Sequence, residues 1–223
     1  MTNNGVGTMT LQLPECRDGL CVGIMGGTFD PIHLGHLVIA EEVRIQYELD
    51  KVIFVPTGYP PHKAKRKVTD PEHRYLMTVL ATINNPYFTV SRVEIDRAYE
   101  LTYTIDTLRF FNNYYQGKAE IYFITGADAI MDILSWKDYG ELFSLCHFIA
   151  VTRPGYNLNI EETIGKVCPQ ALSRIEVLEI PAMQISSTLI RQRVVAGKPI
   201  RYLTPDAVTQ YIYKNGLYRH ARE

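Results

Sequence analysis

The stretch that decides the fold spans residues 20–36 and reads LCVGIMGGTFDPIHLGH. Its first six residues are apolar enough to form a buried strand, and the glycines that follow favour a tight turn. Beyond the turn, apolar residues return at roughly helical spacing, at Leu37, Val38, Val43 and Ile45. The stretch therefore predicts a strand, a loop and a helix in that order.

This alternation of strand and helix continues along the chain. Short apolar runs predict further strands at residues 51–55, 87–95, 121–125, 148–152 and 175–180. Helical spacing, a start signal at Asp70-Pro71 and glycines that can end a helix predict helices at 71–83, 104–115, 127–134, 187–196 and 205–214. Strands that alternate with helices need crossover connections, which make the sheet parallel and place helices on both of its faces. We therefore predict an α/β fold, a doubly wound parallel sheet with two C-terminal helices.

Composition excludes several classes of protein. The net charge is −1 and 21% of the residues are charged, so no uniform field favours nucleic acid or an anionic membrane. No apolar run approaches the roughly 18 residues of a membrane span, and the first residues lack a secretory signal. We expect a cytoplasmic protein that binds neither nucleic acid nor membrane. Its four cysteines lack metal-ligand spacing and are interpreted as buried or incidental thiols.

The length of 223 residues is enough for one sizeable domain. We expect residues 19–223 to form it. Residues 1–18 are polar and without periodicity, which is typical of a disordered or loosely attached leader. The sequence leaves open whether the chain forms a homo-oligomer.

Glycines and histidines are concentrated at residues 26–36, directly after the first predicted strand. In an open parallel sheet, this junction is where nucleotides usually bind. Glycines let the backbone approach phosphate oxygens, and free amides at a helix start supply donors. If the helix begins at Leu34, His33 and His36 share one face at its start. A lone histidine here would be interpreted as a solvent-facing loop residue, but the pair favours contact with one triphosphate.

A second cluster, at residues 185–191, reads ISSTLIR and follows the last predicted strand. Serine and threonine are typical N-caps, so the hydroxyls alone indicate little about function. With Arg191 one turn later, however, they form a second cradle for an anion, because arginine can contact two phosphate oxygens at once.

Together the two clusters resemble the HxGH nucleotidyltransferase superfamily, and within it the chain is similar to bacterial nicotinate mononucleotide adenylyltransferases. Further matching segments are residues 60–63 (PPHK), 101–106 (LTYTID), 126–129 (GADA), 135–137 (SWK) and 153–156 (RPGY). The resemblance covers about residues 20–218. It implies a Rossmann-like nucleotidyltransferase fold and transfer of the adenylyl group of ATP to nicotinate mononucleotide, giving deamido-NAD and pyrophosphate in NAD biosynthesis.

The resemblance also implies a role for each matched position. The residues implied to be catalytic, around the ATP phosphates, are Thr28, His33, His36 and Arg191. Further ATP contacts are implied at Gly26, Gly27, Gly35, Ser186, Ser187 and Thr188. The residues implied to bind the acceptor nucleotide are Lys63, Thr104, Gly126, Asp128 and Trp136.

For several of these residues, and for two aspartates, the sequence also allows a purely structural role. Trp136 alone would be typical of a core aromatic, although its place beside the Gly126 turn favours stacking on the acceptor ring. The basic run that contains Lys63 can be a solvated loop or a flap over the phosphates. Asp30 and Asp106 can equally brace a turn or cap a helix.

The implied reaction needs little from the protein beyond alignment. The acceptor phosphate is already anionic at neutral pH, so it can attack the α-phosphorus of ATP without a general base. Catalysis then depends on positioning and on donors aimed at the developing charge. Mg²⁺ is expected to arrive with ATP. Because this ion keeps several waters and uses phosphate oxygens, no metal-binding residue is assigned.

The alternatives differ in acceptor or in class. Related adenylyltransferases act on nicotinamide mononucleotide or phosphopantetheine, although the phosphopantetheine enzymes are usually shorter and do not need the Trp136 segment. An NAD-dependent oxidoreductase is disfavoured because residues 23–28 read GIMGGT and lack the G-x-G-x-x-G spacing. A P-loop kinase would need G-x-x-x-x-G-K-[ST]. A noncatalytic nucleotide sensor with the same fold remains an alternative, although the intact histidines argue against it.

Overall fold

The computed structural model describes residues 13–59, 68–97, 101–153, 159–181 and 184–220. Within these ranges, six parallel strands form one sheet in the order β3-β2-β1-β4-β5-β6. The strands are β1 (Leu20–Gly27), β2 (Lys51–Pro56), β3 (Phe88–Val90), β4 (Ala119–Gly126), β5 (His147–Thr152) and β6 (Ile175–Glu179). The predicted doubly wound parallel sheet is therefore confirmed.

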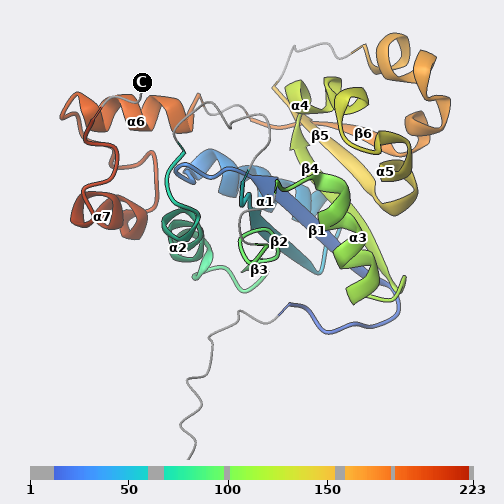
Figure 1. The fold of residues 1–223 in the computed structure, drawn as a ribbon, viewed down its shortest axis with the longest axis horizontal. Helices are drawn as coiled ribbons and strands as arrows, with labels where there is room; N and C mark the ends of the chain where they lie inside the picture. The colour runs from blue at the N-terminus through green and yellow to red at the C-terminus, as the bar shows by residue number, and fades with distance from the viewer. Residues whose placement is uncertain (1–12, 60–67, 98–100, 154–158, 182–183, 221–223) are drawn as a thin grey trace, which may run out of the picture.

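Helices pack on both faces of the sheet (Figure 1). They are α1 (Leu34–Gln46), α2 (Pro71–Thr82), α3 (Thr104–Tyr114), α4 (Ala127–Met131), α5 (Tyr139–Leu145), α6 (Ser187–Val195) and α7 (Asp206–Lys214). Buried residues of α3, α4 and α5 share one apolar cluster with Val22 and Ile24 of β1. Residues of α1, α2, α6 and α7 belong to a second cluster on the opposite face. Figure 1 shows α6 and α7 at the α2 end of the molecule, and α7 packs against α2.

The central strand, β1, positions the site. Its residue Met25 pairs with Phe54 of β2 on one side and with Ile124 of β4 on the other. From β1 the chain first builds the sheet toward β2 and β3, and then crosses to β4. The carboxyl ends of β1 and β4 therefore flank the point where the strand order reverses, which is where ligands bind in open α/β sheets.

The third strand is shorter than the predicted range of 87–95, and several short helices were not predicted from the sequence. β3 ends at Val90, after which the Ser91 amide makes one further bond to the Phe54 carbonyl, at 2.9 Å, and the chain turns. α5 has only seven residues, too few for a clear helical period. Single turns at Glu161–Gly165 and Pro169–Ser173 are shorter still, and the helix predicted at 127–134 is divided into α4 and a turn at Ile133–Ser135.

The last residues of the predicted leader contact the sheet domain. Leu13 packs against the core cluster of α3, and Cys16 Sγ lies 3.2 Å from the Tyr115 carbonyl oxygen, to which it donates. Arg17 forms an ion pair with Asp50. Residues 13–18 are thus attached through side chains that show no periodic pattern in the sequence.

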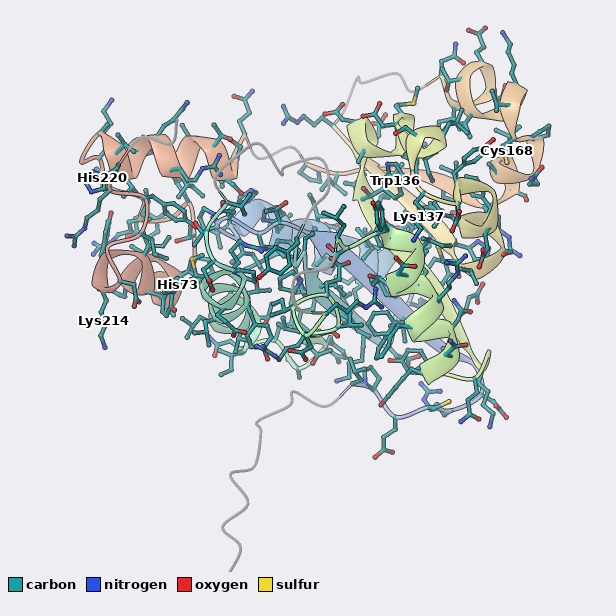
Figure 2. The ribbon with its side chains drawn as sticks, viewed as in Figure 1. His73, Trp136, Lys137, Cys168, Lys214 and His220 are labelled. Carbon is teal, nitrogen blue, oxygen red and sulfur yellow. The ribbon has the colours of Figure 1, made fainter. Side chains whose placement is uncertain are left out.

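The four cysteines are free thiols. Cys146 and Cys168 are buried, and Figure 2 labels Cys168, whereas Cys21 is half-buried and Cys16 exposed. In the part of the chain that the structure describes, we find no helix long and apolar enough to cross a membrane.

Candidate active site

The histidine pair stands at the start of α1. This helix begins at Leu34, so His33 is its N-cap and His36 lies in its first turn. The two imidazole rings stack, with their centroids 3.7 Å apart and an interplanar angle of 24°. The shared face predicted from their spacing is therefore confirmed.

Both imidazoles are uncharged near neutral pH. Burial lowers the pKa of His33 to about 4. Burial, and then the neighbouring His33, lower the pKa of His36 well below its ordinary value. The His33 backbone amide donates to His36 Nδ1 at 3.2 Å, so the proton of the neutral His36 ring is on Nε2. The pair therefore offers hydrogen-bond donors to a ligand without adding buried positive charge.

A cavity of about 340 Å³ opens beside His33. Its wall combines residues from the ends of several elements, namely His33, Gly35, Gly126, Asp128, Thr152, Arg153 and Ile185. Apolar side chains with a few convergent polar groups, in a cavity of this size, are typical of a small-molecule site. His33 Nδ1 is buried without a hydrogen-bond partner among the described residues, which is uncommon for a buried polar atom.

Gly35 is needed for this arrangement. A Cβ at this position would lie 3.1 Å from His33 Nδ1 and 3.2 Å from Cε1, tighter than nine in ten real Cβ contacts. Any side chain would displace the imidazole at the cavity wall. The need for glycine at position 35, between the two histidines, is therefore steric.

Residues 185–191, the second sequence cluster, are hydrogen-bonded to the glycine and histidine cluster at residues 26–36. Ser186 caps α6 by accepting from the Leu189 amide at 3.1 Å, which confirms the N-cap interpretation for this residue. Ser187 Oγ donates to the Pro31 carbonyl at 2.8 Å. Arg191 donates through Nη1 to the Asp30 carbonyl at 2.7 Å and through Nη2 to Thr188 Oγ1 at 3.1 Å. The two motifs, more than 150 residues apart, thus form one site.

The segments expected to hold the acceptor also lie together. Lys137 Nζ lies 4.7 Å from the ring centroid of Tyr103 and 3.4 Å from Asp106 Oδ2. This places the Trp136–Lys137 segment, labelled in Figure 2, beside the first turn of α3, which begins at Thr104.

Trp136 is half-buried and packs edge-on against Phe123 and Phe148, with centroids 6.2 and 6.4 Å apart. The interpretation of Trp136 as a core aromatic therefore holds for one side of its ring. Gly126 and Asp128 line the cavity with His33, whereas Trp136 does not border it. Lys63 lies outside the described residues.

The two aspartates that the sequence left open both brace their surroundings. Asp30 accepts from the Tyr218 hydroxyl at 2.8 Å and from the Thr69 amide at 3.4 Å. Asp106 forms ion pairs with Arg109 and Lys137, each at 3.4 Å. Asp30 thus fixes the turn of the glycine motif, and Asp106 fixes the acceptor segments.

Sequence reasoning missed Arg74 of α2, which is only 1% exposed. Its guanidinium donates to the carbonyls of Thr28, Gly58 and Thr69 at 2.8, 3.0 and 2.8 Å. Nothing in the sequence around residue 74 indicates this, because the three partners come from two other segments of the chain.

No group of three or more His, Cys, Asp or Glu side chains among the described residues is arranged to hold a metal ion. The donor groups here, mainly amides, imidazoles and guanidinium groups, are suited to bind the anion itself.

Comparison with known proteins identifies the relatives of this chain. The cytidylyltransferase-like family model matches residues 24–193. A probable nicotinate-nucleotide adenylyltransferase of Thermoanaerobacter sp. (strain X514) is 56% identical over 92% of this chain and 97% of its own length. One from Moorella thermoacetica is 57% identical over 89% of this chain and 91% of its own length.

Solved structures match the fold at low sequence identity. The Plasmodium falciparum nicotinic acid mononucleotide adenylyltransferase complexed with NaAD superposes with a TM-score of 0.73 and 23% identity, covering 91% of this chain and 98% of that chain. A putative nicotinate-nucleotide adenylyltransferase from Vibrio parahaemolyticus gives a TM-score of 0.62 at 20% identity, covering 91% and 97%. These structures confirm the Rossmann-like nucleotidyltransferase fold.

Proposed function

The chain belongs to the nicotinate-nucleotide adenylyltransferase family, and from this premise we propose that it transfers the adenylyl group of ATP to nicotinate mononucleotide. The products are deamido-NAD, an intermediate of NAD biosynthesis, and pyrophosphate. The observation that carries the proposal is the stacked pair of His33 and His36 at the start of α1, beside a cavity at the switch point of the sheet.

We assign the ATP triphosphate to the start of α1. The positive end of a helix dipole favours an anion, and the two neutral histidines stand at this end of α1, where the Leu34 amide already donates to the Leu203 carbonyl at 3.0 Å. Ser187 and Arg191 approach the same turn from α6. The cavity that Gly35, Gly126 and Asp128 share then suits the nucleoside part of ATP, which is apolar on its faces and polar at its edge.

We assign the acceptor to the other side of β4. Trp136 has one side of its ring packed on the core, which leaves the rest of this half-buried ring for the pyridine of the mononucleotide. The first turn of α3, at Thr104, supplies backbone amides next to it. Such amides can satisfy the two oxygens of a carboxylate, which supports the acid over the amide as the preferred acceptor.

The reaction is a single in-line displacement. An oxygen of the acceptor phosphate forms a bond to the α-phosphorus of ATP, and the bond from that phosphorus to the oxygen bridging to the β-phosphorus breaks. The leaving pyrophosphate takes the electron pair. Donors from Thr28, His33, His36 and Arg191 stabilise the charge that develops on the phosphate oxygens, so no covalent enzyme intermediate is required.

Mg²⁺ would neutralise part of the charge on the triphosphate. The described residues offer no ready cluster of carboxylates, so we assign the ion to phosphate oxygens and water. The cytoplasmic location, the homo-oligomer and the division into residues 1–18 and 19–223 stay predictions.

The experiment that tests this proposal compares the two pyridine mononucleotides. The full-length protein is incubated with ATP, Mg²⁺ and either nicotinate or nicotinamide mononucleotide, and the dinucleotide is quantified by chromatography. We expect the acid to react at least roughly 10²-fold faster, since a mismatched group would be left unpaired in the site. Equal rates with the two mononucleotides would overturn the choice of acceptor. If neither mononucleotide gave a dinucleotide, adenylyl transfer itself would be contradicted.

A further inference from the structure

Among the residues that the structure describes, Arg74 is the largest of the fully buried side chains. Placing a charged guanidinium there costs free energy, and an apolar side chain of similar volume is often at least as stabilising. Burial indeed lowers the pKa of Arg74, while Asp30 is the main charge that opposes this effect. A buried arginine at position 74 therefore indicates a role that an apolar side chain cannot perform.

The guanidinium holds the loop that follows β1. Its Nη1 donates to the Thr28 carbonyl at 2.8 Å. This carbonyl belongs to the same trans peptide as the Phe29 amide, so fixing one fixes the direction of the other. Phe29 itself has a φ of +47°, in the left-handed region that L-residues other than glycine rarely adopt. Arg74 therefore helps to hold a strained turn next to the histidine pair.

The same guanidinium also holds the loop that follows β2. Nη2 donates to the Gly58 carbonyl at 3.0 Å, and Nε donates to the Thr69 carbonyl at 2.8 Å. Gly58 is pressed so closely against Glu94 that a Cβ would lie 2.3 Å from the Glu94 carbonyl oxygen. The loop cannot shift at this point without losing that packing.

This second loop is connected directly to the acceptor segment. The Thr102 amide donates to the Tyr59 carbonyl at 3.1 Å, and Tyr59 pairs with Leu101 in an isolated parallel bridge. Two residues after Thr102, α3 begins at Thr104. A short chain of contacts therefore runs from the turn beside the histidines, through Arg74, to the segment assigned to the acceptor.

We propose that Arg74 is a positioning residue for adenylyl transfer, which sets the turn at Thr28 and the acceptor segment at Thr104 at the separation that the in-line reaction requires. The inference rests on the proposed function. Arg74 does not contact the reacting atoms and acts through the carbonyls of Thr28 and Gly58. Because small displacements of reacting groups can cost orders of magnitude in rate, its loss should lower turnover more than substrate binding.

Arg74→Lys tests this role, since it keeps a long cationic side chain but supplies one nitrogen where three carbonyls are now bound. We expect kcat to fall roughly 10-fold or more, while KM for ATP and for the acceptor changes by less than about 3-fold. Binding of each substrate by calorimetry should be retained. A kcat within about 2-fold of the unmodified protein would overturn the proposal.

Met77→Ala is the matched control, because Met77 is fully buried on the same helix and does not take part in the three carbonyl bonds. It should lower the melting temperature and leave kcat at a temperature of full folding nearly unchanged. If Met77→Ala lost kcat as severely as Arg74→Lys, the effect would be one of helix stability and the proposal would be wrong. The unmodified protein separates the two claims: if it makes no dinucleotide, the proposed function fails, whereas an active protein with a fully active Arg74→Lys refutes only this inference.

Should Arg74→Lys fail to fold, Arg74→Gln provides the second variant, since it is uncharged and retains an amide donor for one carbonyl. The same fall in kcat at retained KM supports positioning, and unchanged kcat contradicts it. Should neither variant fold while Met77→Ala does, the guanidinium is required for the fold itself, and the proposal of a positioning role is abandoned.

Discussion

Tyr218 and Asp30 lie 188 residues apart, and the Tyr218 hydroxyl donates a buried hydrogen bond of 2.8 Å to Asp30 Oδ1. This contact ties the segment after α7 to the turn of the glycine motif. Tyr218 is 7% exposed and Asp30 5%. The segment around Tyr218 is therefore part of the structure that holds the turn of the glycine motif in place.

Tyr218→Phe removes this hydroxyl and keeps the ring. We expect the free energy of unfolding to fall by about 2 kcal/mol, because the variant loses a bond to a buried carboxylate. Urea denaturation at neutral pH measures this. Tyr213→Phe on α7 is the matched control, since this tyrosine is 43% exposed. Equal stability of the two variants would mean that the Asp30 contact contributes little.

The two histidines should make stability depend on pH. Their pKa values are lowered in the folded protein, to about 4 for His33, so the unfolded chain binds protons more readily below about pH 6.5. The stabilisation is complete above that pH and is lost as the pH falls toward 4. From about pH 7.5 to pH 4.5, His33 should account for roughly 2 to 3 kcal/mol of lost stability.

The measurement is the free energy of unfolding at both pH values for the unmodified protein and for His33→Asn. Subtracting the pH-dependent loss of stability of His33→Asn from that of the unmodified protein removes the contribution of the carboxylates, which titrate in both proteins. A difference that does not change with pH would show that His33 titrates normally in the folded state.

His36→Ala removes one neutral donor from the start of α1. We expect kcat to fall roughly 10² or more with the fold retained, the usual scale for loss of one donor to developing charge. His33→Ala should behave similarly. His73→Ala serves as the control, because His73, labelled in Figure 2, is a residue of α2 whose Nδ1 lies 2.8 Å from the Tyr211 hydroxyl of α7. Near-normal turnover of a folded His36→Ala protein would exclude the phosphate role.

Arg191→Lys keeps the charge and loses the fork that now spans the Asp30 carbonyl and Thr188 Oγ1. We expect a higher KM for ATP and a lower kcat, since one ammonium cannot reproduce the two-pronged geometry. Arg193→Lys on the same helix is the control, because Arg193 Nε donates to the Pro199 carbonyl at 2.8 Å. Unchanged ATP kinetics in Arg191→Lys would assign the residue a purely structural role.

Trp136→Ala should mainly raise KM for the acceptor and leave KM for ATP nearly unchanged, since stacking serves the pyridine ring. The variant will also lose stability, because Trp136 packs against Phe123 and Phe148. Trp136→Phe keeps an aromatic face and should recover most of the acceptor binding. Steady-state kinetics with each substrate varied in turn separates the two KM values. An equal rise in both would contradict the assignment.

The sequence predicts most of the fold because its signals are local. The strand, glycine turn and helix at residues 20–36 follow from apolar spacing, and Ser186 and Gly197 mark the bounds of α6 as expected. The relation between the two motifs was also predictable, because both follow strands of one parallel sheet.

What the sequence could not predict depends on contacts between distant segments. Arg74 looks like any arginine of an amphipathic helix, and its burial follows only from the positions of Thr28 and Gly58. Tyr218 likewise gives no local sign of Asp30. The neutral state of His33 and His36 depends on tertiary burial, which no pattern of spacing contains.

Following the phosphorus atoms of ATP tests adenylyl transfer most directly. The protein is incubated with nicotinate mononucleotide and ATP labelled at either the α- or the γ-phosphorus, and the products are separated by chromatography. We predict that the α-label appears in deamido-NAD and the γ-label in pyrophosphate, in equal amounts. Recovery of the γ-label in the nucleotide product, or of the α-label only in ADP or AMP, would contradict adenylyl transfer.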